Sequence, residues 1–195
     1  MEKKYIILGT AFSGFLSFFV WDQYYVDLFC DLKAYPKQFH IELPPRHFKL
    51  LEYKRKTDVS LNKKLLKFYW ASEVDGQELK YIVEELTRLQ DSGIRVVIRN
   101  HPVYGEYFNK NVKHYFRGFH FENPLKKDIY ESLGETDYVF GTYTTVLYEA
   151  LLMGKVIVVN DFRNYIDHLD KIGFYVIKKG SYIPLSALLE RIKDA

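Results

Sequence analysis

Cysteine is almost absent from this sequence, with a single residue, Cys30, among 195. One cysteine excludes a disulfide within the chain and a zinc site built from several thiolates, and it favours a reducing compartment. The histidines other than His101 show no ligand spacing with carboxylates (His40, His47, His114, His120 and His168). We therefore expect no metal site.

Several phosphate and nucleophile motifs are also missing. The chain contains no GxxxxGK[ST], no GxGxxG after a predicted strand and no GxSxG. P-loop hydrolysis, dinucleotide redox chemistry and serine-hydrolase chemistry are therefore without support. An excess of one charge is missing too, because 28 basic residues face 25 acidic ones. This balance gives no reason to expect a nucleic-acid partner.

Aromatic residues, in contrast, are abundant and make up 17% of the chain. With 48% hydrophobic and 27% charged residues, the composition is that of a globular protein. A chain of this length is large enough to bury about 70% of the surface that it exposes when unfolded. The aromatic excess predicts a surface for a partner as well as a core.

Two segments of the first third have unusual composition. Residues 5–21 carry no charge and superficially resemble a signal peptide or a short membrane anchor. Glycine, serine and threonine dilute this run and no small-residue cleavage site follows, so two strands joined by a loop explain it better. Residues 49–62 are rich in lysine and form a predicted linker. Contact with anionic lipid head groups or a charged acceptor is the alternative for the linker.

Strand and helix patterns alternate along most of the chain. We expect strands at 39–43, 65–71, 94–98, 119–121, 137–140, 155–160 and 174–177, and helices at 22–32, 72–92, 104–116, 125–133, 144–153, 165–172 and 184–192. This order predicts an α/β fold with a doubly wound parallel sheet and right-handed crossovers.

Polar residues gather where two of these strands end. The run R-V-V-I-R-N-H-P at 95–102 is β-branched and ends in Arg99, Asn100, His101 and Pro102. The run G-T-Y-T-T at 141–145 repeats this arrangement with hydroxyl groups. Ligands of such sheets bind beyond the carboxyl ends of the strands. We expect the two strand ends to face each other across one ligand.

Each candidate residue has a chemical role and a plainer alternative. Thr144 and Thr145 begin a helix whose free N–H groups attract phosphate, although threonine is also an ordinary N-cap. His101 can donate to a diphosphate or protonate a leaving phosphate, or it simply fixes its loop. Glu149, one helical turn after Thr145, can accept the hydroxyls of a ribose or pair with a lysine such as Lys155.

A general base is predicted near the end of the strand at 65–71. Glu73 and Asp75 follow this strand and are candidates to accept the proton of an acceptor hydroxyl. The alternative is that these carboxylates only favour the first turn of the helix that follows, through its dipole.

The segments R-N-H-P at 99–102 and D-Y-V-F-G-T-Y-T-T-V-L-Y-E-A-L-L-M-G-K-V-I-V-V-N at 137–160 resemble the nucleotide-binding, C-terminal half of GT-B glycosyltransferases. The resemblance is to bacterial capsule and lipooligosaccharide enzymes with an HP motif and a Ser/Thr pair, of the sialyl-, polysialyl- or polyol-phosphate transferase type. It implies a Rossmann-like domain in which His101 and Thr144 or Thr145 bind the donor phosphate. It also implies Glu73 or Asp75 as the base. The donor-binding set comprises Arg99, Asn100, His101, Pro102, Gly141, Thr142, Thr144, Thr145 and Glu149.

The same resemblance suggests how the chain is organised. Segments 18–29 and 44–48 are similar to the end of the first domain of such enzymes, so residues 1–48 are expected to be a remnant of an acceptor domain. Residues 49–62 are the basic linker and residues 63–195 the nucleotide-sugar-binding domain.

The resemblance implies a glycosyltransferase, or the donor-binding half of one, that moves a sugar from a CMP-, CDP- or UDP-linked donor to a surface-polysaccharide acceptor. No cofactor beyond this substrate is expected. A non-catalytic nucleotide-binding or docking subunit, a degenerate fragment and a sugar-nucleotide epimerase are the alternatives. A partner subunit with the acceptor domain, or a homo-oligomer, is expected, in the cytoplasm or on the inner face of the membrane.

Overall fold

The computed structural model describes residues 17–20, 23–32, 34–42, 50, 65–71, 76–161, 170, 173–178 and 184–193. Its contacts divide the chain into two compact units, Met1–Lys49 and Leu50–Ala195. Within the described residues, every helix is too short or too polar to cross a membrane. Most of the strands predicted at 5–21, of the helix predicted at 165–172 and of the basic linker at 49–62 lies outside the described residues.

The first unit contains a small layer of strand and helix. Strands β1 (Phe18–Val20) and β2 (Phe39–Ile41) pair in parallel, and helix α2 (Gln23–Asp31) and the short 3₁₀ helix η1 (Pro36–Gln38) connect them. The rings of Phe18 and Phe29 both stack on Phe39, with centroids 5.4 and 5.6 Å away. The predicted helix at 22–32 is confirmed as α2. The unit's role as the remnant of an acceptor domain stays a prediction.

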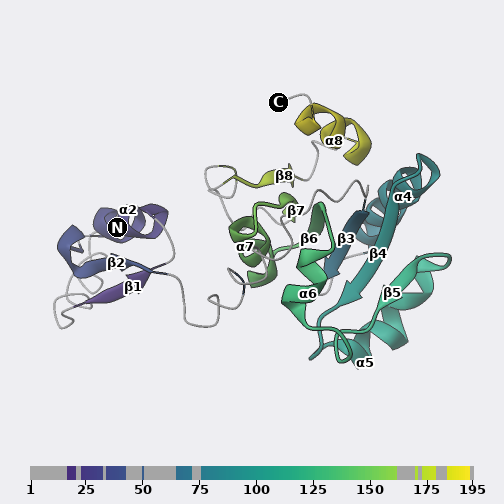
Figure 1. Cartoon of the computed structure of the whole chain (residues 1–195), viewed down its shortest axis with the longest axis horizontal. Coiled ribbons are helices and arrows are strands. Elements are labelled where there is room, and N and C mark those ends of the chain that lie inside the picture. Colours follow the sequence, from purple (N-terminus) through teal and green to yellow (C-terminus); the bar gives the residue numbers. More distant parts are fainter. Residues whose placement is uncertain are drawn as a thin grey trace. The chain divides into compact units, whose positions relative to one another are not determined.

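The second unit alternates strands and helices. In chain order they are β3 (Leu65–Trp70), α4 (Gly76–Asp91), β4 (Arg95–Asn100), α5 (Gly105–Tyr107), the π-helical η3 (Phe108–Val112), the 3₁₀ helix η4 (Lys113–Phe116), β5 (His120–Glu122), α6 (Ile129–Gly134), β6 (Tyr138–Thr142), α7 (Thr145–Leu152), β7 (Val156–Asp161), β8 (Tyr175–Lys178) and α8 (Leu185–Lys193). Figure 1 shows this succession in colour along the chain.

All six strands of this unit are parallel and lie in the order β5-β4-β3-β6-β7-β8. The chain winds outward from β3 to one edge of the sheet and then returns to β6 to wind toward the other. The predicted α/β fold with a doubly wound parallel sheet is therefore confirmed.

Helices cover both faces of this sheet. Alternate residues of β3, Leu66, Phe68 and Trp70, are buried against apolar side chains of α4, η3, η4 and α8. The other face of β3 carries Lys67 and Tyr69, which contact α6. Both faces of the strand are buried, as expected for a central strand of a parallel sheet.

Helix α8 is anchored to α4 by a buried carboxylate. Glu85, whose residue is 2% exposed, accepts a 2.6 Å hydrogen bond from the backbone N–H of Leu185, the first residue of α8. The arginine one turn along α4, Arg88, pairs with the same carboxylate. Because a helix leaves its first N–H groups without partners, this side chain satisfies one of them.

Several element boundaries differ from the sequence predictions, and three of the differences affect β4, α6 and the segment between β4 and β5. Strand β4 continues through Arg99 and Asn100, two residues further than the apolar run. Helix α6 begins at Ile129 rather than 125, since Asp128 caps it by accepting a 2.8 Å bond from the N–H of Tyr130. The helix predicted at 104–116 is divided among α5, η3 and η4.

Candidate functional site

The two strands at the centre of the sheet, β3 and β6, are neighbours, although their last residues, Trp70 and Thr142, are 72 positions apart in the sequence. The winding direction reverses between them, which is where ligands of doubly wound sheets bind. The N–H of Ala71 donates to the hydroxyl Oγ1 of Thr142 at 3.3 Å. Thr142 therefore ties the two strand ends together.

Gly141 allows this close approach of β6 to β3. A Cβ atom at this position would lie 2.7 Å from the backbone oxygen of Tyr69, which is closer than such atoms come. Gly141 and Thr142 are both buried and neither lines the cavity described next. These two predicted donor-binding residues therefore hold β6 against β3 beside the cavity and do not line it.

A cavity of about 170 Å³ lies beside these strand ends, and we call it the switch-point cavity. Its lining comes from the ends of β3 and β4 and the start of α7, with one residue of α6: Tyr69, Trp70, Ala71, Arg99, Asn100, His101, Pro102, Ile129, Thr144, Val146 and Glu149. The structure thus brings six of the predicted site residues together. Thr145 is exposed and outside the lining. Glu73 and Asp75 lie outside the described residues.

The loop after β4 fixes the orientation of His101. Its backbone N–H donates to the carbonyl of Trp70 at 2.9 Å, which joins the loop to the end of β3. The N–H of Val103 donates to Nδ1 of the imidazole at 3.2 Å. This bond uses the lone pair of Nδ1, so the neutral imidazole carries its proton on Nε2. A ring held in this form offers a hydrogen-bond donor to a ligand.

Helix α7 presents its first turn to the same cavity. Thr144 is the N-cap residue, with extended φ and ψ angles of −158° and 156°, and its hydroxyl makes no capping bond. The first N–H groups of a helix need partners and carry partial positive charge. Because the Thr144 hydroxyl does not cap the helix, both this hydroxyl and the first backbone N–H groups of α7 are available to bind an anion.

Arg99 lines the cavity with its guanidinium already engaged. Nη1 lies 2.5 Å from Oε1 of Glu122 at the end of β5, and Nη2 donates to the carbonyl of Lys127 at 2.8 Å. The Arg99 side chain is only 6% exposed. The predicted role in donor binding stays a prediction, and the contacts that the structure shows are those with Glu122 and Lys127.

Glu122 is the centre of a buried network that sequence patterns do not reveal. Lys67, with 2% of its side chain exposed, donates to Glu122 at 2.7 Å, to the carbonyl of Ser132 at 2.9 Å and to Glu135 at 3.1 Å. Tyr69 shares a 2.8 Å hydrogen bond with the hydroxyl of Ser132. The network joins β3, β4, β5 and α6 directly beside the cavity.

The environment shifts the proton equilibria of this network. Burial on its own would raise the pKa of Glu122, but hydrogen bonds from Lys67, Ser132 and Arg99 outweigh it and hold the pKa below the ordinary value. Burial raises the pKa of the Tyr69 hydroxyl, which therefore stays protonated at neutral pH. The site thus keeps a charged carboxylate and a neutral phenol side by side.

Two further residues line the cavity: Glu149, which the sequence predicts as a site residue, and Trp70, which it does not. Glu149 is 5% exposed on α7 and reaches the cavity, in agreement with its predicted place one turn below Thr145. Trp70 was not among the candidates, because an apolar residue at a strand end looks like core. Its indole N–H is buried and has no hydrogen-bond partner among the described residues.

Metal binding has no candidate cluster in the part of the chain that the structure describes. No three histidine, cysteine or acidic side chains there lie close enough to hold an ion. The donors gathered at the switch-point cavity, an imidazole Nε2–H, a threonine hydroxyl and helix N–H groups, suit an anion.

The sequence matches no protein-family model and no curated protein. Among solved structures, the wall teichoic acid polymerase TagF is similar, with a TM-score of 0.51 and 12% identity over 98% of this chain and 52% of TagF. A histidine-to-asparagine variant of TagF soaked with CDPG gives 0.51 and 16% over 99% and 50%. A glycosyltransferase from Rickettsia africae gives 0.51 and 12% over 100% and 57%.

The chain spans about half the length of these solved structures. At such low identities the similarity concerns the fold. The fold of this chain is therefore the α/β fold with a parallel sheet that these glycosyltransferase structures contain.

Proposed function

We propose that this chain is the donor-binding half of a glycosyltransferase that moves a sugar from a nucleotide-activated donor to a saccharide acceptor. One observation carries the proposal. The switch-point cavity brings His101, which follows β4, together with Thr144, the N-cap residue of α7, and Glu149 of α7, from parts of the sequence more than 40 residues apart. A phosphate flanked by a sugar and a ribose needs this combination of donors and one carboxylate.

The geometry suggests how the leaving group is stabilised. In the transfer, the acceptor oxygen bonds to the anomeric carbon while the bond from this carbon to the phosphate oxygen breaks and leaves its electrons on the nucleotide. The Nε2–H of His101 and the first turn of α7 are placed to neutralise this developing charge. The hydroxyl proton of the acceptor passes to a base, for which Glu73 and Asp75 are the candidates.

The similar solved structures support this proposal. Two of those reported above are described as a polymerase of wall teichoic acid and a glycosyltransferase, and one TagF variant was soaked with CDPG. A nucleotide-activated donor, CMP-, CDP- or UDP-linked as the resemblance implies, is compatible with these descriptions. The type of sugar and the sialyl- or polyol-phosphate class stay predictions.

A thermal-shift screen with CMP, CDP, UDP and GDP tests the donor site. A ligand at 100 times its Kd adds about 2.7 kcal/mol to the stability of the folded state, which for a chain of this size raises Tm by about 5 to 10 °C. We expect one nucleotide to give such a shift and Thr144→Ala to reduce it. Thr145→Ala, next to it but outside the cavity, is the matched control and should leave the shift unchanged.

A nucleotide-binding subunit without transfer activity of its own is a second candidate, because the chain spans only about half of the similar structures. The two candidates predict the same nucleotide shift. They differ in turnover, since only a glycosyltransferase releases free nucleotide from a nucleotide sugar when an acceptor saccharide is added. Equal shifts in wild type and Thr144→Ala, or no shift with any of the four nucleotides, would count against both.

A further inference from the structure

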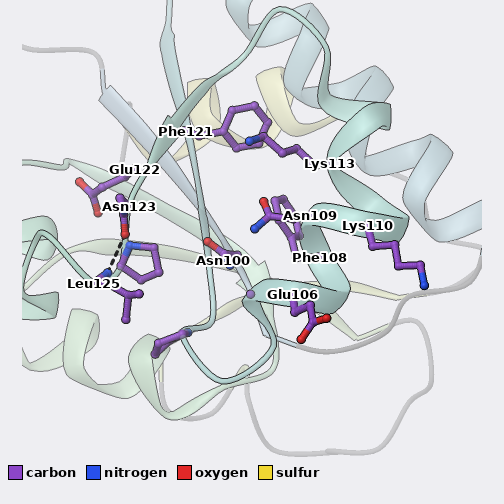
Figure 2. A pocket seen from close by; sticks show the side chains of 13 residues that line it. Asn100, Glu106, Phe108, Asn109, Lys110, Lys113, Phe121, Glu122, Asn123 and Leu125 are labelled. Carbon is purple, nitrogen blue, oxygen red and sulfur yellow. Dashed lines mark hydrogen bonds between the residues drawn. The ribbon is translucent and has the colours of Figure 1, made fainter.

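A second and larger cavity, of about 810 Å³, lies beyond the carboxyl ends of β4 and β5. We call it the β5 groove. Figure 2 shows Asn109 and Lys113 of the helical wall on one side, Asn123 and Leu125 of the loop after β5 on the other, and Asn100 between them. Asn100 and Pro102 line both this groove and the switch-point cavity, so the two hollows are neighbours.

The groove is open to solvent and lined by groups that suit a polyhydroxylated chain. Phe121 is 39% exposed and Leu125 is 83% exposed, so the lining offers apolar surface to C–H groups. Asn109 and Asn123 present amide groups, which both donate and accept hydrogen bonds. The oxygen of Asn123 already accepts a 2.9 Å bond from the N–H of Leu125, so its NH₂ group remains for a ligand.

The charge of this region favours an anionic ligand. Residues 103–127 include five lysines or arginines and two glutamates. Lys127 is paired with Glu135, and Glu122 with Lys67 and Arg99, which leaves four basic residues against one carboxylate, Glu106, which also lines the groove. Lys110 and Lys113 line the groove and have no carboxylate partner among the described residues, and the ammonium group of Lys113 lies 5.0 Å above the ring of Phe121. Their charge is therefore free to attract an anion.

We propose that the β5 groove binds the acceptor as an acidic, polyhydroxylated chain, in which phosphate or carboxylate groups contact Lys110 and Lys113. This inference rests on the proposed function, because the acceptor matters only if a donor binds at the switch-point cavity. The shared wall of Asn100 and Pro102 places a hydroxyl of such a chain beside the donor. A membrane surface fits less well, because the lysines flank a hollow lined by amides rather than a protruding apolar face.

The test measures binding of the full chain to three oligomers of similar length: a glycerol phosphate oligomer, an oligogalacturonate and neutral maltohexaose. We expect at least one anionic oligomer to bind more tightly than maltohexaose and to weaken as salt is raised. Lys110→Ala combined with Lys113→Ala should reduce this affinity at least about fivefold, as expected for loss of two charged contacts. The matched control is Lys80→Ala combined with Arg95→Ala, which removes two exposed charges away from the groove.

Several outcomes would overturn the proposal, and they are distinct from failure of the donor site. Equal binding of charged and neutral oligomers, or equal losses in the two double variants, would contradict it. If the Lys110/Lys113 variant instead lost affinity for the nucleotide identified by the thermal-shift screen, the groove would hold the nucleoside of the donor, and the donor proposal would stand. Binding only to vesicles with anionic lipids would assign the lysines to a membrane. Failure of every nucleotide to bind would refute the donor site without affecting the oligomer measurement.

Discussion

Single residues carry the features of this protein that its sequence patterns conceal. Lys67 occupies the centre of the strand L-L-K-F-Y-W and is 1% exposed, where a buried parallel strand normally has an apolar side chain. Its partners, Glu122 and Ser132, lie 55 and 65 positions further along the chain. Periodicity reports which face a residue occupies, but it contains no information about partners so distant. Only the folded arrangement, in which β5 and α6 bring Glu122 and Ser132 to Lys67 of β3, reveals the network.

The lowered pKa of Glu122 predicts how stability depends on pH. Because its folded-state pKa lies below the unfolded value of about 4.3, the unfolded chain binds more protons as the pH falls, and the free energy of unfolding decreases below about pH 5. Glu122→Gln removes this titration and should flatten the decrease, while lowering stability at pH 7 by about 3 kcal/mol or more because Lys67 and Arg99 lose their counter-charge.

Urea unfolding at pH 7, 5 and 4 measures this dependence. The control is Glu106→Gln, in which an exposed carboxylate with no ion pair to a described residue is replaced. This control should follow the wild-type curve. Some slope should remain in Glu122→Gln, because the pKa of Glu135 is also lowered, against the effect of its burial, by hydrogen bonds from Lys127 and Lys67. Parallel curves for wild type and Glu122→Gln would show that Glu122 does not couple folding to protonation.

Among the helices and strands of the second unit, most were predicted correctly from the sequence. The errors concern where an element begins or ends when polar residues form that boundary. The β-branched run 95–98 marked β4, but Arg99 and Asn100 also belong to the strand because they pair with Tyr69 and Trp70 of β3. Helix α6 was placed too early, because Asp128 is a capping residue that the apolar pattern does not weigh. Strand length and helix start were thus set by pairing and capping rather than by hydrophobicity.

The contact between β6 and β3 predicts a contrast between two glycine variants. Gly141→Ala places a methyl group 2.7 Å from the carbonyl oxygen of Tyr69, so β6 must shift, at a cost of about 1 to 3 kcal/mol. Gly76→Ala, at the start of α4, meets no atom within 4 Å and should be neutral or stabilising by up to about 1 kcal/mol. Urea denaturation of both variants checks the contrast. Equal stabilities would mean that the two strands tolerate a wider spacing.

For the molecule as a whole, the sequence predicted most of the polar lining of the switch-point cavity but not the β5 groove. The R-N-H-P and G-T-Y-T-T segments were identified because each lies at the end of a strand, and the sheet order places these two strands, β4 and β6, on either side of β3. Within the second segment the structure separates Thr144, which lines the cavity, from the exposed Thr145. The β5 groove was not predicted, since its walls come from two irregular segments without a shared pattern.

The central claim is that a nucleotide phosphate binds at His101, and calorimetric titration tests it most directly. The ligand is the nucleotide among CMP, CDP, UDP and GDP that gives the largest thermal shift. We expect binding to wild type and to His114→Ala, which replaces an exposed histidine on η4. His101→Ala should bind at least about tenfold more weakly, the effect of losing one hydrogen bond to a charged group. Equal affinity in His101→Ala and wild type would show that the nucleotide phosphate does not bind at His101.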